Sequence, residues 1–237
     1  MEGKNKPIVA ALVVAAGSGS RMGGSTLKQF IKIYDKPILQ YTLEKFQAYP
    51  HIQHIYTILP EEFVGEYSLV IRNKWKITKF VRAVAGGAER HLSVWAGLQA
   101  LDAEDKIVMI HDGVRPFVSQ RILSESIRAA ERYGAAVVGM RPKDTVKQIA
   151  KAQVKKTLDR TQIVLAQTPQ TFRKEIILRA NQFAFKNNSF STDDAALVEQ
   201  IGETVTVVPG EWQNIKITSP EDLIIARAYI DAEVACA

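Results

Sequence analysis

The sequence predicts an α/β protein: a three-layer, mostly parallel, Rossmann-like sheet with helices on both faces and a protruding β-arm. Two observations predict this fold. Apolar runs alternate with amphipathic segments along most of the chain, as in repeated strand–helix units. The alternation is broken once, near 145–158, where no helix separates two short runs. With 237 residues, 46% of them hydrophobic, the chain is long enough for a single domain over 1–237.

The first half of the chain alternates strands and helices. Continuous apolar runs predict strands that are buried on both faces. Pro37 is expected to begin a helix, because Leu39, Leu43 and Phe46 then recur on one helical face. In chain order we expect a strand at Ile8–Val14, a helix from Pro37, strands at His54–Leu59 and Phe80–Ala85, and a helix over 89–101.

The second half continues the alternation and contains the predicted arm. Ser119 is a favourable N-cap for the helix that follows it. The runs 145–149 and 154–158 alternate polar and apolar residues, which is typical of a hairpin. An isolated hairpin is barely stable, so a second subunit is expected to cover it. The remaining elements are strands at 107–110, Ala135–Met140, 204–208 and 215–217, and helices at 119–133, 173–185, 193–201 and 220–232.

The most informative segment is the glycine-rich loop that follows the first predicted strand. It carries Arg21 and Lys28, so backbone N–H groups and positive charge converge where phosphate oxygens would lie. The P-loop pattern fails, because Ser25 stands where that motif has lysine. The dinucleotide fingerprint fails at Met22, where glycine or alanine is required. Phosphate binding is favoured, and a purely structural tight turn is the alternative.

Composition narrows the class of ligand and the compartment. The net charge of +6 suits acidic ligands, but the charges are spread and lack interleaved aromatic residues, which disfavours nucleic acid. Cys236 is the single cysteine, so internal disulfides are impossible and a reducing, cytoplasmic location is expected. Four scattered histidines disfavour a zinc site. No apolar run has the length of a membrane span, and a signal peptide ending near 15–17 is a weaker alternative.

Polar residues follow several predicted strands, at the edge where open α/β sheets bind ligands. Asp112 follows a buried strand, where a carboxylate suits a divalent ion that bridges phosphate oxygens. Capping of a helix or pairing with Arg115 are alternative roles for Asp112. The other polar or small residues expected at this edge are Gly86, Gly87, Arg90, His111, Arg141, Lys143, Asp144, Thr145 and Lys216.

Nine motifs together resemble one family, the 2-C-methyl-D-erythritol 4-phosphate cytidylyltransferases of non-mevalonate isoprenoid biosynthesis. The similarity extends from about Val9 to Ala232, with the motifs in matching order and spacing. They are AAGSGSRMG at 15–23, LKQF at 27–30, GGAER at 86–90, SVWAGL at 93–98, HDGVRPF at 111–117, KDTVK at 143–147, QTPQTF at 167–172, TDDA at 192–195 and NIKIT at 214–218.

The resemblance implies a homodimeric nucleotidyltransferase that joins CTP to a polyol phosphate and releases pyrophosphate. It implies Mg²⁺ on Asp112, with no nucleic-acid or membrane partner. The arm at 141–165 would clasp a second subunit, so Thr145 and Arg160 would act across the interface. The implied catalytic residues are Arg21, Lys28 and Lys216; the nucleotide-binding residues are Ala15, Ala16, Gly17, Gly19, Gly87, Ser93 and Asp112; and the substrate-binding residues are Thr145, Arg160, Thr168 and Arg115.

Three positions depart from the family pattern, and three other functions remain open. Leu27 replaces a usual proline, Ala88 a usual aspartate, and Gln213 a frequently acidic residue that has been linked to the metal. Asp112 would then be the only protein carboxylate on the ion. A cytidylyltransferase for another polyol phosphate, such as ribitol 5-phosphate, is the nearest alternative. A nucleotide-binding regulator without turnover and a dinucleotide-dependent oxidoreductase are more distant ones.

Overall fold

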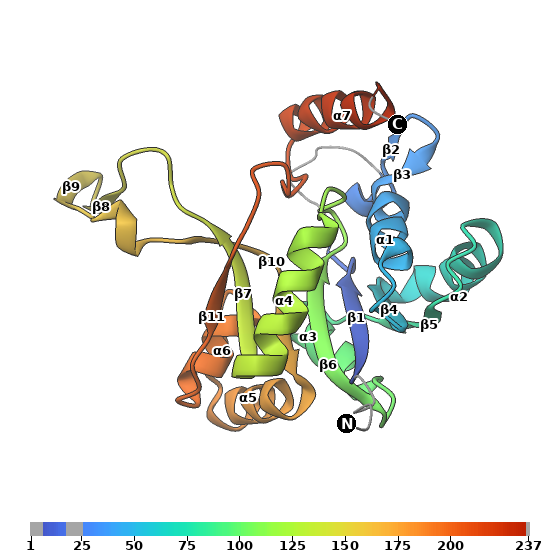
Figure 1. Ribbon diagram of the computed structural model, residues 1–237, viewed down its shortest axis with the longest axis horizontal. Coiled ribbons are helices and arrows are strands. Elements are labelled where there is room, and N and C mark those ends of the chain that lie inside the picture. Colours follow the sequence, from blue (N-terminus) through green and yellow to red (C-terminus); the bar gives the residue numbers. More distant parts are fainter. Residues whose placement is uncertain (1–6, 18–25, 236–237) are drawn as a thin grey trace, which may run out of the picture.

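The computed structural model describes residues 7–17 and 26–235, and its centre is a seven-stranded sheet (Figure 1). The strand order is β11-β7-β10-β6-β1-β4-β5. β10 runs antiparallel to both of its neighbours, and the other pairings are parallel. The predicted fold class is confirmed. The strands are β1 (Ile8–Val14), β4 (His54–Leu59), β5 (Phe80–Ala85), β6 (Asp105–Asp112), β7 (Ala135–Met140), β10 (Leu165–Arg173) and β11 (Thr206–Pro209).

Helices cover both faces of the sheet, and a seventh helix lies beyond its edge. The side chains of β1 alternate between two cores: Val9 packs in the core that contains α1 and α4, and Ala10 packs in the core that contains α3, α5 and α6. Burial on both faces explains the continuous apolar run of β1. The helices are α1 (Ile38–Ala48), α2 (Glu61–Leu69), α3 (Arg90–Gln99), α4 (Gln120–Tyr133), α5 (Lys174–Asn187), α6 (Asp194–Gln200) and α7 (Pro220–Ala235).

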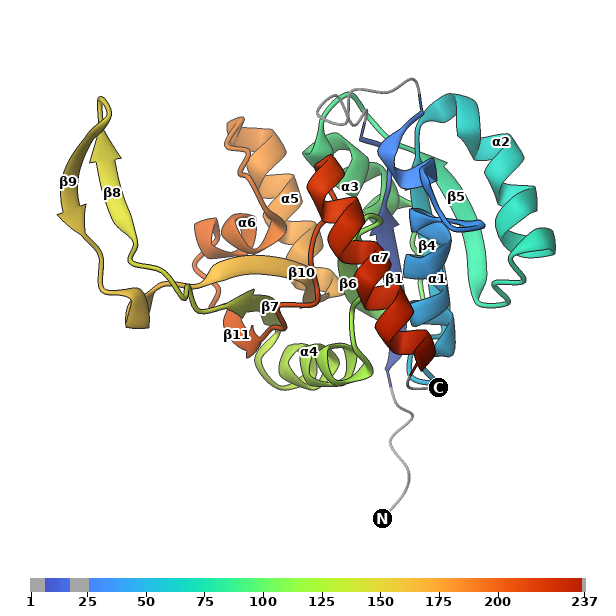
Figure 2. The same cartoon turned by 90° about the horizontal axis from the view of Figure 1, so that it is seen from above.

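One helix and several shorter elements complete the fold. α7 packs through Ala226 and Ile230 onto a third core that includes Ile33 and Ile38, so it spans the edge above β1 (Figures 1 and 2). Within the described ranges, no helix combines the length and apolar character that a membrane span requires. The short elements are β2 (Lys32–Ile33), β3 (Lys36–Pro37), the 3₁₀ turns η2 (Lys28–Phe30) and η4 (Arg160–Gln162), and the π-helical turn η3 (Val70–Lys74).

The structure confirms most predicted elements and corrects three. α4 begins at the predicted cap, since the Ser119 side chain accepts a hydrogen bond from the Ile122 N–H. The prediction omitted α2, which buries none of its residues fully, and β10. The predicted strand at 215–217 was wrong: this segment joins no strand, and the Ile217 N–H donates to the Val114 carbonyl at 2.9 Å.

The predicted arm is a two-stranded hairpin that projects from the sheet (Figure 2). β8 (Lys147–Ala150) pairs antiparallel with β9 (Gln153–Thr157), and every residue of both strands is exposed. Lys151 and Ala152 connect the strands with φ of 46° and 63°, the backbone twist that suits a two-residue hairpin loop. The arm leaves the sheet after β7 and returns into β10 (Figure 1).

Gly97 allows α3 to approach the sheet closely, which gives a test of the packing. A Cβ at Gly97 would lie 2.6 Å from Leu12 Cδ1 and 3.0 Å from Ile58 Cδ1, too close for a side chain. We expect Gly97→Val to lower the free energy of unfolding by about 1–3 kcal/mol, measured by urea denaturation. Gly65→Ala in α2 is the control, because no atom lies within 4 Å of its added Cβ. An unchanged midpoint for Gly97→Val would contradict this packing.

Candidate active site

A cavity of about 400 Å³ lies beyond the carboxyl ends of β1, β5 and β6. It is lined by residues 14–17, 28–29 and 87–90, together with Ser93, Asp112, Val114 and Lys216. This is the expected position for a ligand in an open α/β sheet. The lining combines backbone-rich turns on one side with charged side chains on the other. Both kinds of group suit a phosphorylated ligand.

The turns after β1 and β5 lie against each other. The Ala15 N–H donates to the Ile58 carbonyl at 2.8 Å, and the Gly86 N–H donates to the Leu59 carbonyl at 2.7 Å. A Cβ at Gly86 would lie 2.3 Å from the Ala16 Cβ, so only glycine permits this approach. The glycine therefore fixes the distance between the two walls of the cavity.

Ser93 holds the turn that contains Gly87. Its buried hydroxyl oxygen accepts a hydrogen bond from the Gly87 N–H at 3.1 Å and lies 3.2 Å from the Glu89 carbonyl oxygen. Because the hydroxyl is occupied by the turn, it orders the backbone at 87–89 along the cavity wall. The structure thus places Gly87 and Ser93 together at the cavity, where Ser93 makes a supporting contact to the turn.

Asp112 is surrounded by three cations. Its Oδ2 lies 3.0 Å from Lys216 Nζ and 3.2 Å from Arg115 Nε, and its Oδ1 lies 4.0 Å from Arg90 Nε. Burial acts to raise the pKa of Asp112, but Lys216, Arg90 and Arg115 outweigh it and hold the pKa well below its usual range. Asp112 is therefore an ionised carboxylate at neutral pH, with lysine and arginine held around it.

Arg90 belongs to this cluster; the sequence predicts it at this edge of the sheet, but the family resemblance implied no role for it. Its Nη2 lies 2.7 Å from Asp194 Oδ2. Burial acts to lower the pKa of Arg90, but Asp194 and Asp112 outweigh burial and raise the pKa above its usual range. The guanidinium therefore stays charged. Gln170 Oε1 accepts from the backbone N–H groups of Asp194 and Ala195, which fixes the start of α6 on β10. The signal was present in the GGAER motif, where Arg90 directly follows the turn.

A second, smaller cavity of about 140 Å³ adjoins the first at this cluster. Arg90, Asp112 and Lys216 line both cavities. The second cavity also includes Arg115, residues 166–168, Gln170 and residues 192–193. Two ligands could therefore meet at one set of charged groups, one from each cavity.

A chain of hydrogen bonds under the cluster holds β6 and β10 in register. The Asp112 N–H donates to Thr168 Oγ1 at 3.1 Å, and Thr168 Oγ1 lies 3.2 Å from His111 Nδ1. His111 Nε2 lies 3.0 Å from the Arg115 carbonyl, which can only accept. His111 thus donates from Nε2 and accepts the Thr168 hydroxyl at Nδ1. Burial lowers the pKa of His111 to about 4, so it is neutral at pH 7.

Removing the Thr168 hydroxyl tests this chain. In Thr168→Val the Asp112 N–H and His111 Nδ1 lose their partner while the side-chain volume stays the same. We expect the free energy of unfolding to fall by about 1–3 kcal/mol in urea denaturation. Thr168→Ser keeps the hydroxyl and is expected to retain most of the stability. A larger loss in Thr168→Ser than in Thr168→Val would indicate that the methyl group, and not the hydroxyl, stabilises the site.

The structure brings most predicted site residues together. Thr168 and Arg115 line the second cavity. Thr145 and Arg160 are exposed on the arm and line neither cavity, and Arg160 Nη1 donates to the Lys143 carbonyl within the arm. Gly19 and Arg21 lie outside the described residues. The predicted residues that line the first cavity are Ala15, Ala16, Gly17, Lys28, Gly87, Ser93, Asp112 and Lys216.

The arrangement of donors around Asp112 fits a divalent cation. Among the described residues, Arg90 contacts Asp112 Oδ1, and its Nε is 4.0 Å away; the closest contacts of Arg115 and Lys216 are to Oδ2. Oδ1 is therefore the oxygen better placed to accept a metal ion. One carboxylate with phosphate oxygens is a usual Mg²⁺ environment. Gln213 lines a different cavity, beside Phe117 and Tyr229, and so contributes no ligand here.

Another group of possible metal ligands lies elsewhere. Ligand atoms of His54, Asp102 and Glu104 fall within 4.8 Å of one another. His54 begins β4, so this group lies at the amino edge of the sheet, opposite the cavity. Arg82 also pairs with Asp102 at 2.9 Å. This group therefore belongs to a different part of the molecule from the Asp112 cluster.

Comparisons with known proteins identify the family of the chain. Residues 9–232 match the family model described as 2-C-methyl-D-erythritol 4-phosphate cytidylyltransferase. The chain is 45% identical over 229 residues to the protein of that name from Syntrophus aciditrophicus, covering 96% of this chain and 98% of the relative. The identity to the protein of that name from Clostridioides difficile is 44%, over 94% of each chain.

Solved structures give the same result. The crystal structure of 4-diphosphocytidyl-2C-methyl-D-erythritol synthase from Anaerococcus prevotii superposes with a TM-score of 0.84 at 34% identity, covering 95% of this chain and 96% of that one. The 2-C-methyl-D-erythritol 4-phosphate cytidylyltransferase from Francisella tularensis gives 0.76 at 32% identity, covering 93% and 99%. The chain therefore belongs to the 2-C-methyl-D-erythritol 4-phosphate cytidylyltransferase family.

Proposed function

We propose that this protein transfers the cytidylyl group of CTP to 2-C-methyl-D-erythritol 4-phosphate, in non-mevalonate isoprenoid biosynthesis. The observation that carries the proposal is the meeting of two cavities at Arg90, Asp112 and Lys216. The larger cavity has the volume and glycine-lined turns that suit a nucleotide, and the smaller one suits a compact sugar phosphate. The products are 4-diphosphocytidyl-2-C-methyl-D-erythritol and pyrophosphate.

The reaction needs positioning and charge neutralisation more than proton transfer. A phosphate oxygen of the acceptor attacks the α-phosphorus of CTP, and the bond from that phosphorus to the bridging oxygen of pyrophosphate breaks. The acceptor phosphate is already anionic at neutral pH, so no general base is required. His111 fits this mechanism, since both ring nitrogens are occupied by Thr168 and Arg115 and the ring is neutral.

Cations at the junction of the cavities would stabilise the developing charge. Lys216 contacts both cavities and suits the α-phosphate, while Lys28 lies near Gly17 at the wall formed by the turn after β1. Arg21 is proposed to act with Lys28 on the triphosphate. Asp112 would hold Mg²⁺, which would supply positive charge to neutralise the phosphates. Arg90 and Arg115 hold the Asp112 carboxylate in place.

We further propose that the site is completed by the arm of a second subunit. Thr145 and Arg160 are exposed and line neither cavity of their own chain, which supports a role for them in the site of a partner. Ile149 and Val154 are 65% and 61% exposed on the hairpin. Apolar side chains on an exposed hairpin suit a surface that a second copy covers.

A pyrophosphate-release assay tests the proposed function. The purified protein is incubated with CTP and Mg²⁺, and with either 2-C-methyl-D-erythritol 4-phosphate or ribitol 5-phosphate. We expect release with the first acceptor and little with the second. Release with ribitol 5-phosphate alone would support the related polyol-phosphate activity, and release with neither would support a nucleotide-binding regulator.

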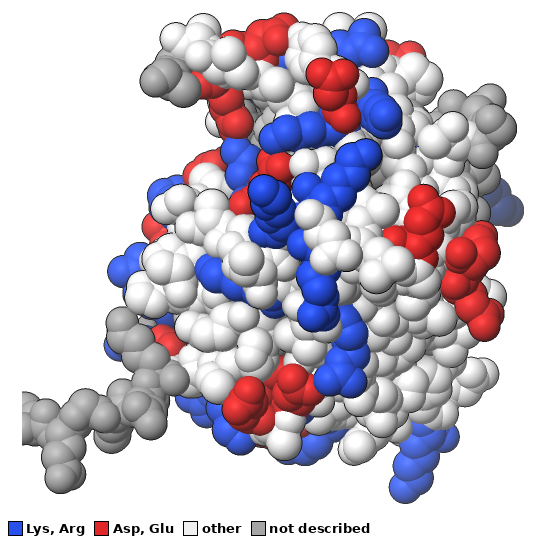
Figure 3. All heavy atoms as spheres, turned by 90° about the vertical axis from the view of Figure 1, so that its right-hand side faces the viewer, with Lys and Arg blue, Asp and Glu red and all other residues white. Residues whose placement is uncertain are grey.

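Two further expectations concern where the protein is located in the cell and which partners it lacks. The single cysteine, Cys236, is the basis for a proposed cytoplasmic location. On the face in Figure 3, lysines and arginines gather in a band down the middle, with acidic side chains above, beside and below it. We propose no nucleic-acid partner because charges along the chain are spread and lack interleaved aromatic residues. The positive net charge of +6 is then explained by small, highly anionic substrates.

A further inference from the structure

We propose that Gln29 is a nucleotide-binding residue whose side-chain amide donates a hydrogen bond to a phosphate oxygen of CTP. The inference rests on the proposed function and assigns this residue a contact within the nucleotide cavity. It is carried by the burial of Gln29, by the lack of partners for its carboxamide, and by its place in the cavity wall.

Gln29 is buried yet unpartnered. It is 1% exposed, and both its Nε2 and its Oε1 are shielded from solvent without a hydrogen-bond partner. In the described ranges, four other residues have one such atom each: Thr57, Ser126, Thr171 and Asn214. None of those four lines the 400 Å³ cavity, whereas Gln29 does. Gln29 therefore combines a cavity position with two unsatisfied polar atoms.

Such an arrangement is unfavourable for the protein alone. A buried polar group without a partner destabilises the folded state, and an apolar side chain of the same shape avoids that loss. Sites that depart from this rule are commonly functional, since a ligand supplies the missing partner. The simplest role for the Gln29 amide is a hydrogen bond that forms only when the cavity is filled.

The neighbours of Gln29 hold it in place. It is the middle residue of η2, and the next residue, Phe30, stacks on Tyr67 with ring centroids 4.1 Å apart and contacts Phe63 at 5.0 Å. The Phe30 N–H also donates to the Leu27 carbonyl at 2.9 Å. A donor on such an anchored turn loses little conformational freedom on binding, so its hydrogen bond contributes efficiently to affinity.

The position of Gln29 favours a phosphate rather than the base. Lys28 precedes it in the cavity wall, and a Cβ placed on Gly17 would lie 3.9 Å from Lys28 Cε, so this wall belongs to the turn after β1. The turn at 87–89, held by Ser93, forms another part of the lining and suits the base. An amide N–H that donates to an anionic oxygen makes a stronger hydrogen bond than one to a neutral acceptor.

Gln29→Met tests the proposal, because methionine has a similar length and no hydrogen-bonding amide. We expect CTP affinity, measured by calorimetric titration, to fall by about 10- to 100-fold. Cytidine affinity and the KM for the acceptor should be unchanged, and the melting temperature without ligand should stay the same or rise. Gln99→Met, at an exposed position on α3, is the matched control and should bind CTP normally.

Four outcomes would overturn the proposal. Unchanged CTP affinity together with a lower melting temperature would mean that Gln29 has a structural role only. Equal losses for CTP and cytidine would place the amide on the base or ribose. If the unaltered protein neither binds CTP nor releases pyrophosphate, the proposed function fails and this inference fails with it. If the unaltered protein turns over normally and Gln29→Met leaves CTP affinity unchanged, only the inference is rejected.

Discussion

Replacing Lys216 by alanine is expected to lower kcat on the order of 10²–10³-fold while changing the KM for CTP much less. Lys216 Nζ lies 3.0 Å from Asp112 Oδ2 and lines both cavities. This is where we propose that the charge of the reacting phosphate develops. A contact that strengthens in the transition state affects turnover more than ground-state binding. Steady-state kinetics with CTP and acceptor varied separately measure the two effects.

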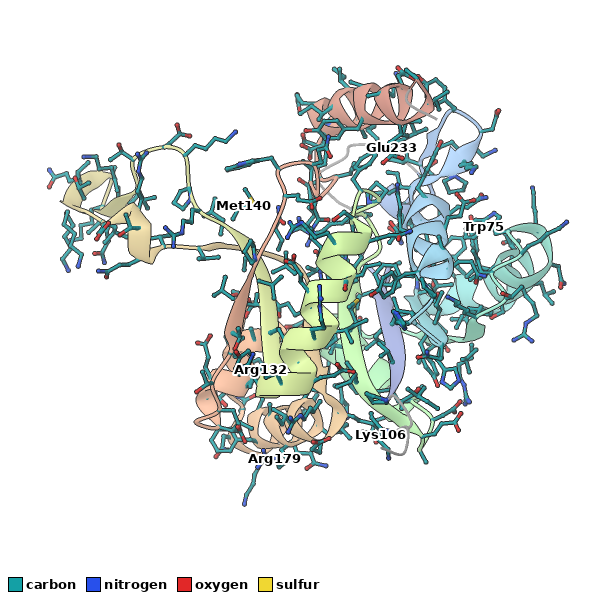
Figure 4. The ribbon with its side chains drawn as sticks, viewed as in Figure 1. Trp75, Lys106, Arg132, Met140, Arg179 and Glu233 are labelled. Atoms are coloured by element: carbon teal, nitrogen blue, oxygen red, sulfur yellow. The ribbon has the colours of Figure 1, made fainter. Side chains whose placement is uncertain are left out.

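Two further variants make this result specific. Lys28→Ala is expected to show the same pattern, because Lys28 is proposed to act on the departing pyrophosphate. Lys106→Ala is the control: Lys106 is exposed and lies at the opposite end of the sheet from α7 (Figure 4). Near-normal turnover in both Lys28→Ala and Lys216→Ala would reject the roles assigned to these lysines. A large rise in KM with unchanged kcat would reassign them to ground-state binding.

Mixing two inactive variants is expected to restore activity if the arm acts in the partner's site. Arg160→Ala lacks a functional arm but has an intact cavity, and Lys216→Ala has the reverse defect. In a mixed dimer, the intact cavity of the first chain receives the intact arm of the second, so one of its two sites is complete. Random exchange of subunits should recover roughly a quarter of the wild-type sites. Pyrophosphate release before and after co-refolding measures the recovery.

The complementation experiment has an internal control. Lys28→Ala and Lys216→Ala both damage the cavity, so a mixture of these two variants should remain inactive. Ile149→Asp places a charge on the exposed side of the hairpin and is expected to weaken association, measured by sedimentation equilibrium. Lack of recovery in the Arg160 and Lys216 mixture, with mixed dimers demonstrated by mass, would show that each chain completes its own site.

Strands and helices with strong periodicity could be predicted from the sequence, and weakly patterned elements could not. The run Ile8–Val14 is buried on both faces, so its composition alone indicates a central strand. α2 buries no residue fully, and its apolar side chains are only partly buried against the core. Its sequence therefore shows only a weak helical periodicity. The segment at 215–217 resembles a strand because Ile217 is buried, but α7 and the loop after β6 bury it instead of a sheet.

The site was predictable as a set of motifs but not as a set of contacts. Sequence order identified the residues near Asp112, since parallel strands present their carboxyl ends at one edge. β10 was not predicted, because its antiparallel insertion between β6 and β7 depends on long-range pairing. For the same reason the hydrogen bond from the Asp112 N–H to Thr168 and the ion pair of Arg90 with Asp194 could not be inferred.

The reversed direction of β10 has a consequence for how this enzyme can diversify. Because β10 runs opposite to β7, the chain between them starts and ends at the catalytic edge, with Met140 near the point of departure (Figure 4). The whole insertion from 141 to 164 is thus a replaceable module between two fixed strand ends. Its length and residues can change without altering the register of the sheet. On the proposed role of the arm, exchanging this module between relatives would transfer subunit-pairing preference while the nucleotide chemistry stays with the recipient.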